Sequence, residues 1–187
     1  MRFLSISGTH GPRLSGVVAM LTVAGLAVGM LAVPSAVADE KSPRSCAVQG
    51  HLTEGDTNNL VTVIHGNTEI DTFTHPIYFD GAFSPVGIAQ ERDVTDLTTF
   101  VSQVSATIVY AGRVRCDNGD VSRFGVLEIK FLATASFDTN SFVGTFRIIG
   151  SAGGLAGTSG HGTVSGVPGV PGGNGPFVGT LHLGGDA

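Results

Sequence analysis

Residues 105–137, SATIVYAGRVRCDNGDVSRFGVLEIKFLATASF, decide the fold of this chain. In the first part, every second residue is apolar or glycine, so that one face carries Ala106, Ile108, Tyr110, Gly112 and Val114. This period of two predicts a half-buried strand. Asn118-Gly119 then favours a tight turn, because both positions tolerate positive φ. The return strand, expected over 121–137, also alternates, and the stretch therefore predicts a long β-hairpin.

Further strands are expected on both sides of this hairpin. The segments with strand character are 46–53, 60–65, 69–74, 77–83, 142–149, 160–166 and 177–183. Residues 91–104 are ambiguous: Asp93 could cap a short helix, but the threonines and Phe100 favour a loop that leads into a strand. Turns are expected at 138–140 and 150–154. Residues 167–176 are rich in proline and glycine and predict a loop.

These segments predict an all-β fold with a single antiparallel sheet. About eight strands with short connections and no long helix must protect their edges, either as a sandwich or as a barrel. The chain contains 28 glycines, many of them inside the expected strands, where they permit the sharp coiling that closure needs. We therefore expect residues 39–187 to form one domain, an eight-stranded barrel.

The composition excludes several classes of protein. Only 13% of the residues are charged, 42% are apolar and the net charge is −5, which argues against a coiled coil, a collagen or a highly charged disordered chain. The negative charge also argues against a nucleic-acid-binding protein, which needs a basic face.

Residues 1–38 are expected to be an export signal that is removed. Arg2 and Arg13 make the start positive, residues 17–33 carry no charge, and Ala36-Val37-Ala38 is a cleavage pattern before Asp39. The apolar run is shorter than the roughly 20 residues of a membrane span. We expect a secreted or extracytoplasmic protein with no transmembrane segment after cleavage. In such a protein the two cysteines, Cys46 and Cys116, predict one disulfide.

A glycine-rich motif lies in the last third of the chain. Residues 144–166 read GTFRIIGSAGGLAGTSGHGTVSG, with Gly150, Gly153 and Gly154 at the expected turn and Gly160 and Gly162 in the next strand. The motif resembles exported bacterial proteins of the allene oxide cyclase and dirigent barrel type. The resemblance implies an eight-stranded barrel with an apolar interior. We interpret the motif as structural, with Leu155 closing one end of the core, and it brings no catalytic residue with it.

Candidate ligand-binding residues lie on the central hairpin and the strand that follows. If the barrel interior holds a ligand, inward side chains there would set its orientation. The candidates are Tyr110, Arg113, Glu128, Phe131 and Phe146. The period of two puts Tyr110 on the apolar face and Arg113 and Glu128 on the more polar faces, and the alternative is that these two are ordinary outward charges.

No motif of a metal or cofactor site is found. The histidines, His75 among them, lack metal-ligand spacing. The acidic clusters at 54–56 and 91–96 lack the pattern of a calcium loop, and we interpret them as solvated loops. The sequence also lacks a phosphate-binding loop and a nucleophile elbow. No metal, cofactor or catalytic residue is therefore expected.

The leading hypothesis is a non-catalytic binding or cell-surface module for a small apolar ligand or an envelope component. The absence of a catalytic constellation favours it. A cyclase or isomerase that confines its substrate inside the barrel is one alternative. A structural or adhesive envelope protein with an exposed apolar patch is another.

The export and disulfide hypotheses predict the mass of the secreted protein. The denatured protein should begin at Asp39 and weigh two hydrogens less than its reduced form. Mass spectrometry of the denatured protein checks both points. A protein that begins at Met1 would contradict the export hypothesis, and two free thiols would contradict the disulfide.

Overall fold

The computed structural model describes residues 44–187 except 118, 120–121, 169–173 and 185–187. These residues form ten strands: β1 (Arg44–Glu54), β2 (Asn58–His65), β3 (Thr68–Gly81), β4 (Phe83–Ser84), β5 (Val86–Asp96), β6 (Val101–Arg115), β7 (Ser122–Ser136), β8 (Ser141–Gly153), β9 (Ser159–Gly166) and β10 (Asn174–Leu183). Among the described residues, none forms a helix with the length and apolar character needed to cross a membrane. The expected export signal and its cleavage site lie outside the described residues.

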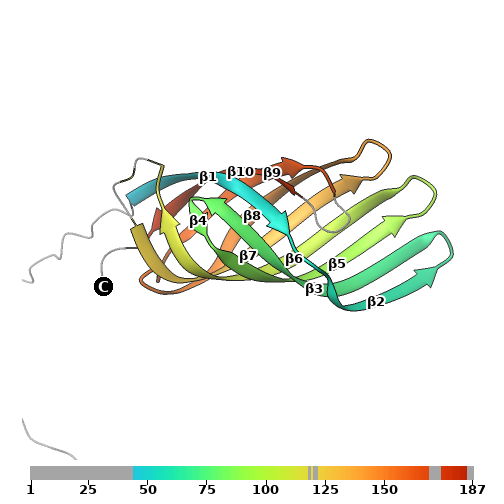
Figure 1. Ribbon diagram of the computed structural model, residues 1–187, viewed down its shortest axis with the longest axis horizontal. Helices are drawn as coiled ribbons and strands as arrows, with labels where there is room; N and C mark the ends of the chain where they lie inside the picture. Colours follow the sequence, from blue (N-terminus) through green and yellow to red (C-terminus); the bar gives the residue numbers. More distant parts are fainter. Residues whose placement is uncertain (1–43, 118, 120–121, 169–173, 185–187) are drawn as a thin grey trace, which may run out of the picture. The chain divides into compact units, whose positions relative to one another are not determined.

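The strands form one antiparallel sheet that closes on itself (Figure 1). Hydrogen-bonded neighbours follow the order β1-β10-β9-β8-β7-β6-β5-β3, and β3 pairs back with β1. This ring of eight strands confirms the predicted all-β, antiparallel architecture. Two strands lie off the ring, because β2 adds to the edge of β3 and β4 pairs with β6.

The central hairpin is confirmed. Strands β6 and β7 pair without interruption from Val101↔Ser136 to Arg115↔Ser122. The residues predicted to share the buried face of each strand are buried, Tyr110 and Leu127 completely. The predicted disulfide joins Cys46 of β1 to Cys116 at the end of β6. It therefore links the first strand of the ring to the hairpin.

The sequence prediction is wrong for strand β3. It is one strand where two were expected, at 69–74 and 77–83, and it runs through Pro76. On one side β3 pairs with β2 up to Thr74 and with β1 from Ile77 onward. Pro76 falls between these two partners, so its missing N–H costs no ladder hydrogen bond. The local sequence does not show where one neighbour gives way to the next.

The sequence prediction is also wrong for strand β5. Residues 86–96 form a strand, whereas no strand was expected at 86–90 and a loop was expected from 91. The loop is only the turn at 97–100, where the carboxylate of Asp96 accepts hydrogen bonds from the N–H groups of Thr98 and Thr99. The strand was missed because its inward face carries two carboxylates beside its glycine and alanine, and so lacks apolar alternation.

The glycine-rich motif has a different turn from the one predicted. Strand β8 continues to Gly153, and the turn comprises residues 154–157. Gly150 lies inside β8 at an irregularity in its pairing with β7. Leu155 in the turn is completely buried, in agreement with its expected role at one end of the core.

Aromatic side chains fill the half of the ring that lies toward the disulfide. Phe79, Phe83, Tyr110 and Phe177 form a cluster with ring centroids 5.3–6.2 Å apart, and Phe146 contacts Phe177 at 6.3 Å. Tilted and edge-on geometries of this kind stabilise aromatic cores. A void of about 20 Å³ lies among these side chains.

Gly162 makes one close approach possible in this core. A Cβ at this position would meet the carbonyl oxygen of Val178 and the ring of Phe146. We expect Gly162→Ala to lower the free energy of unfolding by about 1–3 kcal/mol, because the backbone and an interior ring must both shift.

Gly150→Ala is the matched control, because its Cβ would meet only the exposed side chain of Glu128. We expect it to leave the stability nearly unchanged. Urea unfolding of both variants checks the prediction. Equal losses of stability in the two variants would contradict the close packing at Gly162.

Candidate functional site

A cavity of about 140 Å³ lies at the end of the ring away from the disulfide. One wall, from β7 and β8, is apolar and contains Phe131, Ala133, Ala135 and Phe142. The other wall, from β1, β3, β5 and β6, is polar and contains Glu54, His75, Glu91, Asp93 and Ser102. Phe73 and Val104 lie within this polar wall, opposite Glu91 and Asp93. The cavity thus joins two chemically different walls, contributed by strands from around the ring.

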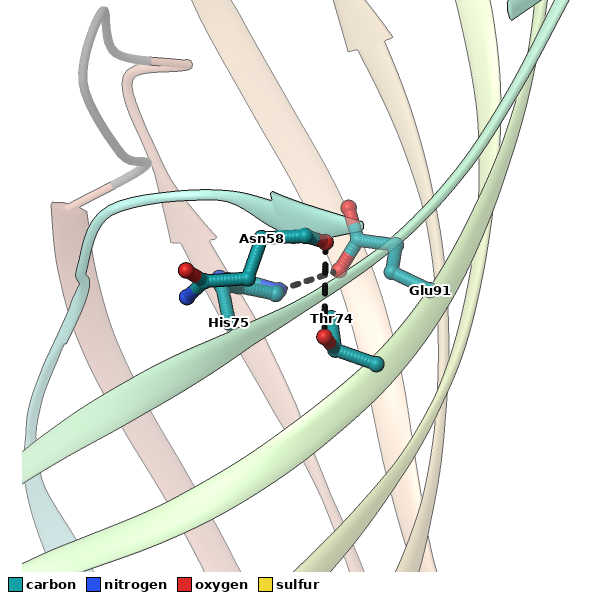
Figure 2. A network of polar contacts seen from close by, with 4 residues as sticks. All are labelled: Asn58, Thr74, His75 and Glu91. Carbon is teal, nitrogen blue, oxygen red and sulfur yellow. Dashed lines mark hydrogen bonds and ion pairs between the residues drawn. The ribbon is translucent and has the colours of Figure 1, made fainter. Parts of the chain in front are cut away.

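Strand alternation points His75 and Glu91 into the ring. His75 lies two residues before the buried Ile77 on β3, and Glu91 lies two residues after the buried Ala89 on β5. The register His75↔Ala89 makes His75 and Glu91 diagonal neighbours across the β3–β5 pair. Their side chains point toward each other (Figure 2), with His75 Nε2 and Glu91 Oε2 3.1 Å apart. Both side chains are buried, so this hydrogen bond is desolvated, and it becomes an ion pair when His75 is protonated.

Glu54 joins this pair through the closing contact of the ring. It is the last residue of β1 and pairs with Ile77 of β3. Each of the three residues, Glu54, His75 and Glu91, contributes one possible metal-ligand atom, and these three atoms lie within 4.8 Å of one another. The three residues come from three strands and meet only because β1 and β3 pair.

A hydrogen bond beside this cluster ties the entry of β2 to β3. Thr74 Oγ1 donates to the carbonyl oxygen of Asn58 at 3.3 Å (Figure 2). Thr74 directly precedes His75, so this hydrogen bond fixes the backbone of β3 next to the residue that carries the imidazole.

The environment raises two pKa values in the polar wall. Burial by itself lowers the pKa of His75, but the hydrogen bond and negative charge of Glu91, with the charge of Glu54, raise it above its ordinary value of 6.5. Burial, the charge of Glu91 and a hydrogen bond with Glu91 raise the pKa of Asp93 to about 8, with smaller effects of Glu54 and Asp71. Asp93 therefore keeps its proton at neutral pH.

Two buried polar atoms of this wall have no hydrogen-bond partner, namely Ser102 Oγ and Asp93 Oδ1. Ser102 is only 1% exposed. An unsatisfied buried polar group costs about 1–3 kcal/mol. Such groups are uncommon in native cores, and each one requires an explanation, such as a bound ion or a functional role.

The structure places the sequence candidates differently from the prediction. Tyr110 is inside, but its hydroxyl accepts a hydrogen bond from Ser84 N–H at 2.8 Å and lies 2.7 Å from the carbonyl oxygen of Arg113. Burial raises the pKa of this phenol. Tyr110 holds β4 and β6 together rather than facing an open site.

The hypothesis that Arg113 and Glu128 orient a ligand in the interior is wrong, because both lie exposed on the outer face, in agreement with the alternative that they are outward charges. Each occupies the alternate positions of a strand whose other face is the core, so neither can line the interior. Phe131 lines both the cavity and the small void in the aromatic half, whereas Phe146 lines the small void and not the cavity. Of the five candidates, Phe131 alone contacts the cavity.

The polar wall was not predicted from the sequence, because its acidic residues were assigned to loops. Glu54, Glu91 and Asp93 were interpreted as parts of solvated loops, and that interpretation is wrong for Glu91, which is 5% exposed. The alternation of residues along 87–93 could have indicated the site. Gly87, Ala89, Glu91 and Asp93 share one face, and the first two are small residues suited to a crowded interior.

The raised pKa of Asp93 predicts a pH-dependent stability. Between about pH 4 and pH 8 the folded protein keeps a proton that the unfolded chain releases, so stability falls as the pH rises through this window. His75, Glu91, Glu54 and Asp71 are the charged groups that act on it or its partner. We expect Asp93→Asn to flatten this fall and to be more stable than the wild type at pH 8.

Urea unfolding at pH 5 and pH 8 in metal-free buffer measures this effect. Asp80→Asn, at an exposed position of β3, is the control and should keep the wild-type pH dependence. If Asp93→Asn and the wild type lost the same stability between the two pH values, the buried, protonated state of Asp93 would be wrong.

In the comparisons with known proteins, no family model and no curated protein matches this chain. A closed β-sheet does not by itself imply an activity. The function is therefore inferred from the chemistry of the cavity.

Proposed function

We propose that this chain is an exported, non-catalytic protein that binds a small amphipathic molecule in the cavity at the open end of the ring. The observation that carries the proposal is the pair of unlike walls around one cavity of about 140 Å³. The apolar part of the ligand packs against the phenylalanines. Its polar end meets the wall that contains His75 and Glu91.

The size of the cavity limits the ligand. An apolar protein cavity of about 150 Å³ holds a molecule of the size of benzene. The ligand, or the part that enters the cavity, is therefore about one ring in size. The void of about 20 Å³ in the aromatic half has no room for such a group, so we place the ligand at the open end rather than throughout the interior.

The unpartnered polar atoms support a ligand with a polar end. Ser102 Oγ and Asp93 Oδ1 lack partners and line the same cavity. A ligand that hydrogen-bonds them removes the penalty of leaving them unsatisfied. The purely apolar ligand expected from the sequence would leave that penalty in place.

The packed aromatic half favours binding over the cyclase or isomerase alternative. Catalysis by confinement requires a space that surrounds the reacting molecule. Here Phe79, Phe83 and Phe177 pack against one another inside the ring and take up space there. What remains is suited to holding a small group.

Location outside the cytoplasm is part of this proposal. The disulfide between Cys46 and Cys116 is compatible with an oxidising compartment. We also keep the resemblance to allene oxide cyclase and dirigent barrels as a proposal. The ring of eight antiparallel strands supports it.

Native mass spectrometry of the protein purified from the culture medium tests the proposal. We expect a bound small molecule in the wild type and at least tenfold lower occupancy in Ala135→Leu, because the added carbons fill the cavity that Ala135 lines. Thr134→Leu, on the outer face of the same strand, is the control and should retain the ligand.

Three outcomes would contradict the proposal. Equal occupancy in Ala135→Leu and Thr134→Leu would place the ligand elsewhere. A bare wild-type mass, with no change in melting temperature on adding culture extract, would favour the structural or adhesive alternative. Conversion of the recovered ligand to an isomer by the wild type would instead favour the enzyme.

A further inference from the structure

Three side chains of the polar wall have the arrangement of metal ligands. Donor atoms of Glu54, His75 and Glu91 lie within 4.8 Å of one another. Two donors bound to one tetrahedral zinc ion at about 2.1 Å are about 3.4 Å apart. His75 Nε2 and Glu91 Oε2 already approach this spacing at 3.1 Å. Glu54 supplies the third donor from the end of β1.

The donor set selects the class of metal. One imidazole nitrogen and two carboxylate oxygens suit Zn²⁺ and related divalent transition metals. Calcium requires six to eight oxygen ligands, more than this cluster offers. The cavity lining contains three carboxyl groups, from Glu54, Glu91 and Asp93, and one imidazole. A divalent cation that displaces the proton between His75 Nε2 and Glu91 Oε2 to solvent balances the charges of the two ligand carboxylates, Glu54 and Glu91.

Ser102 provides a second, independent observation. Its hydroxyl comes from β6 and is not part of the cluster of three, yet it faces the same cavity, is 1% exposed and has no hydrogen-bond partner. A metal ion with three protein ligands keeps an open position for water or a ligand oxygen. A hydroxyl in the cavity wall is suited to hydrogen-bond such a group.

We propose that Glu54, His75 and Glu91 bind one Zn²⁺ ion, or a related divalent transition metal, whose open position faces the cavity. The polar end of a molecule in the cavity is then an oxygen group that coordinates the ion. The metal site goes beyond the ligand binding proposed above and does not rest on it, because the ion can bind without an organic molecule.

Titration with ZnCl₂ tests the site. The full-length exported protein is stripped with a chelator, dialysed and titrated by calorimetry, and its zinc content is then measured by elemental mass spectrometry. We expect one Zn²⁺ per chain. Glu91→Gln, His75→Gln and Glu54→Gln should each weaken binding at least about tenfold, because each removes a ligand.

Two controls separate this site from surface binding. Glu128→Gln and His161→Gln change an exposed carboxylate and an exposed imidazole on the outer face and should bind Zn²⁺ like the wild type. Replacement of zinc by Co²⁺ gives a second readout, since visible absorption reports a four-coordinate site. Glu54→Gln alters a half-buried side chain at the end of β1, so it keeps the proposal testable if a variant at His75 or Glu91 fails to fold.

Three results would overturn the proposal: no zinc bound by the wild type, zinc binding that the three substitutions leave unchanged, or zinc binding lost equally in the controls. Stabilisation by benzylamine without zinc binding would show that the carboxylates recognise an organic cation instead. The titration contains no organic ligand. Its failure is therefore distinguishable from a failure of small-molecule binding in the native mass spectrum.

Discussion

The pairing of β1 with β3 is the contact on which the rest of the structure depends. It closes the sheet into a ring, and along Gly50–Glu54 of β1 and Ile77–Gly81 of β3 it pairs N–H and C=O groups that an open edge would leave unpaired. The same pairing sets Glu54 opposite Ile77, so that the carboxylate reaches His75. One backbone contact thus completes the fold and assembles the polar wall. The disulfide between Cys46 and Cys116 holds the other end of β1 against the hairpin.

The two ends of the interior differ: one is packed with apolar side chains, and the other contains the polar groups. Toward the disulfide, aromatic and aliphatic side chains pack with almost no empty space, and burial of this kind is the main favourable contribution to folding. At the other end, the buried hydrogen bond between His75 and Glu91, a carboxyl group with a raised pKa and an unpartnered hydroxyl occupy positions that an apolar core would fill better. Natural proteins depart from good packing in this way at functional sites.

The structure shows which kinds of sequence pattern were informative. The β6–β7 hairpin was predictable because apolar residues alternate along both strands around an Asn-Gly turn. The disulfide was predictable because the chain has two cysteines. Strand β5 was not, because Glu91 and Asp93 occupy inward positions where apolar residues would have shown the period. The buried carboxylates thus concealed both their strand and the site.

What the amino-acid sequence by itself determined is the local structure: strands rather than helices, the faces of the long hairpin, and a single covalent cross-link. These follow from the period of two and from residue type, which act over a few neighbouring residues. Only the tertiary structure decided that β3 exchanges β2 for β1 at Pro76, that the sheet closes, and that Glu54, His75 and Glu91 meet. Those outcomes depend on the register between strands far apart in the chain, and register is set by the sum of many non-local contacts rather than by any one segment.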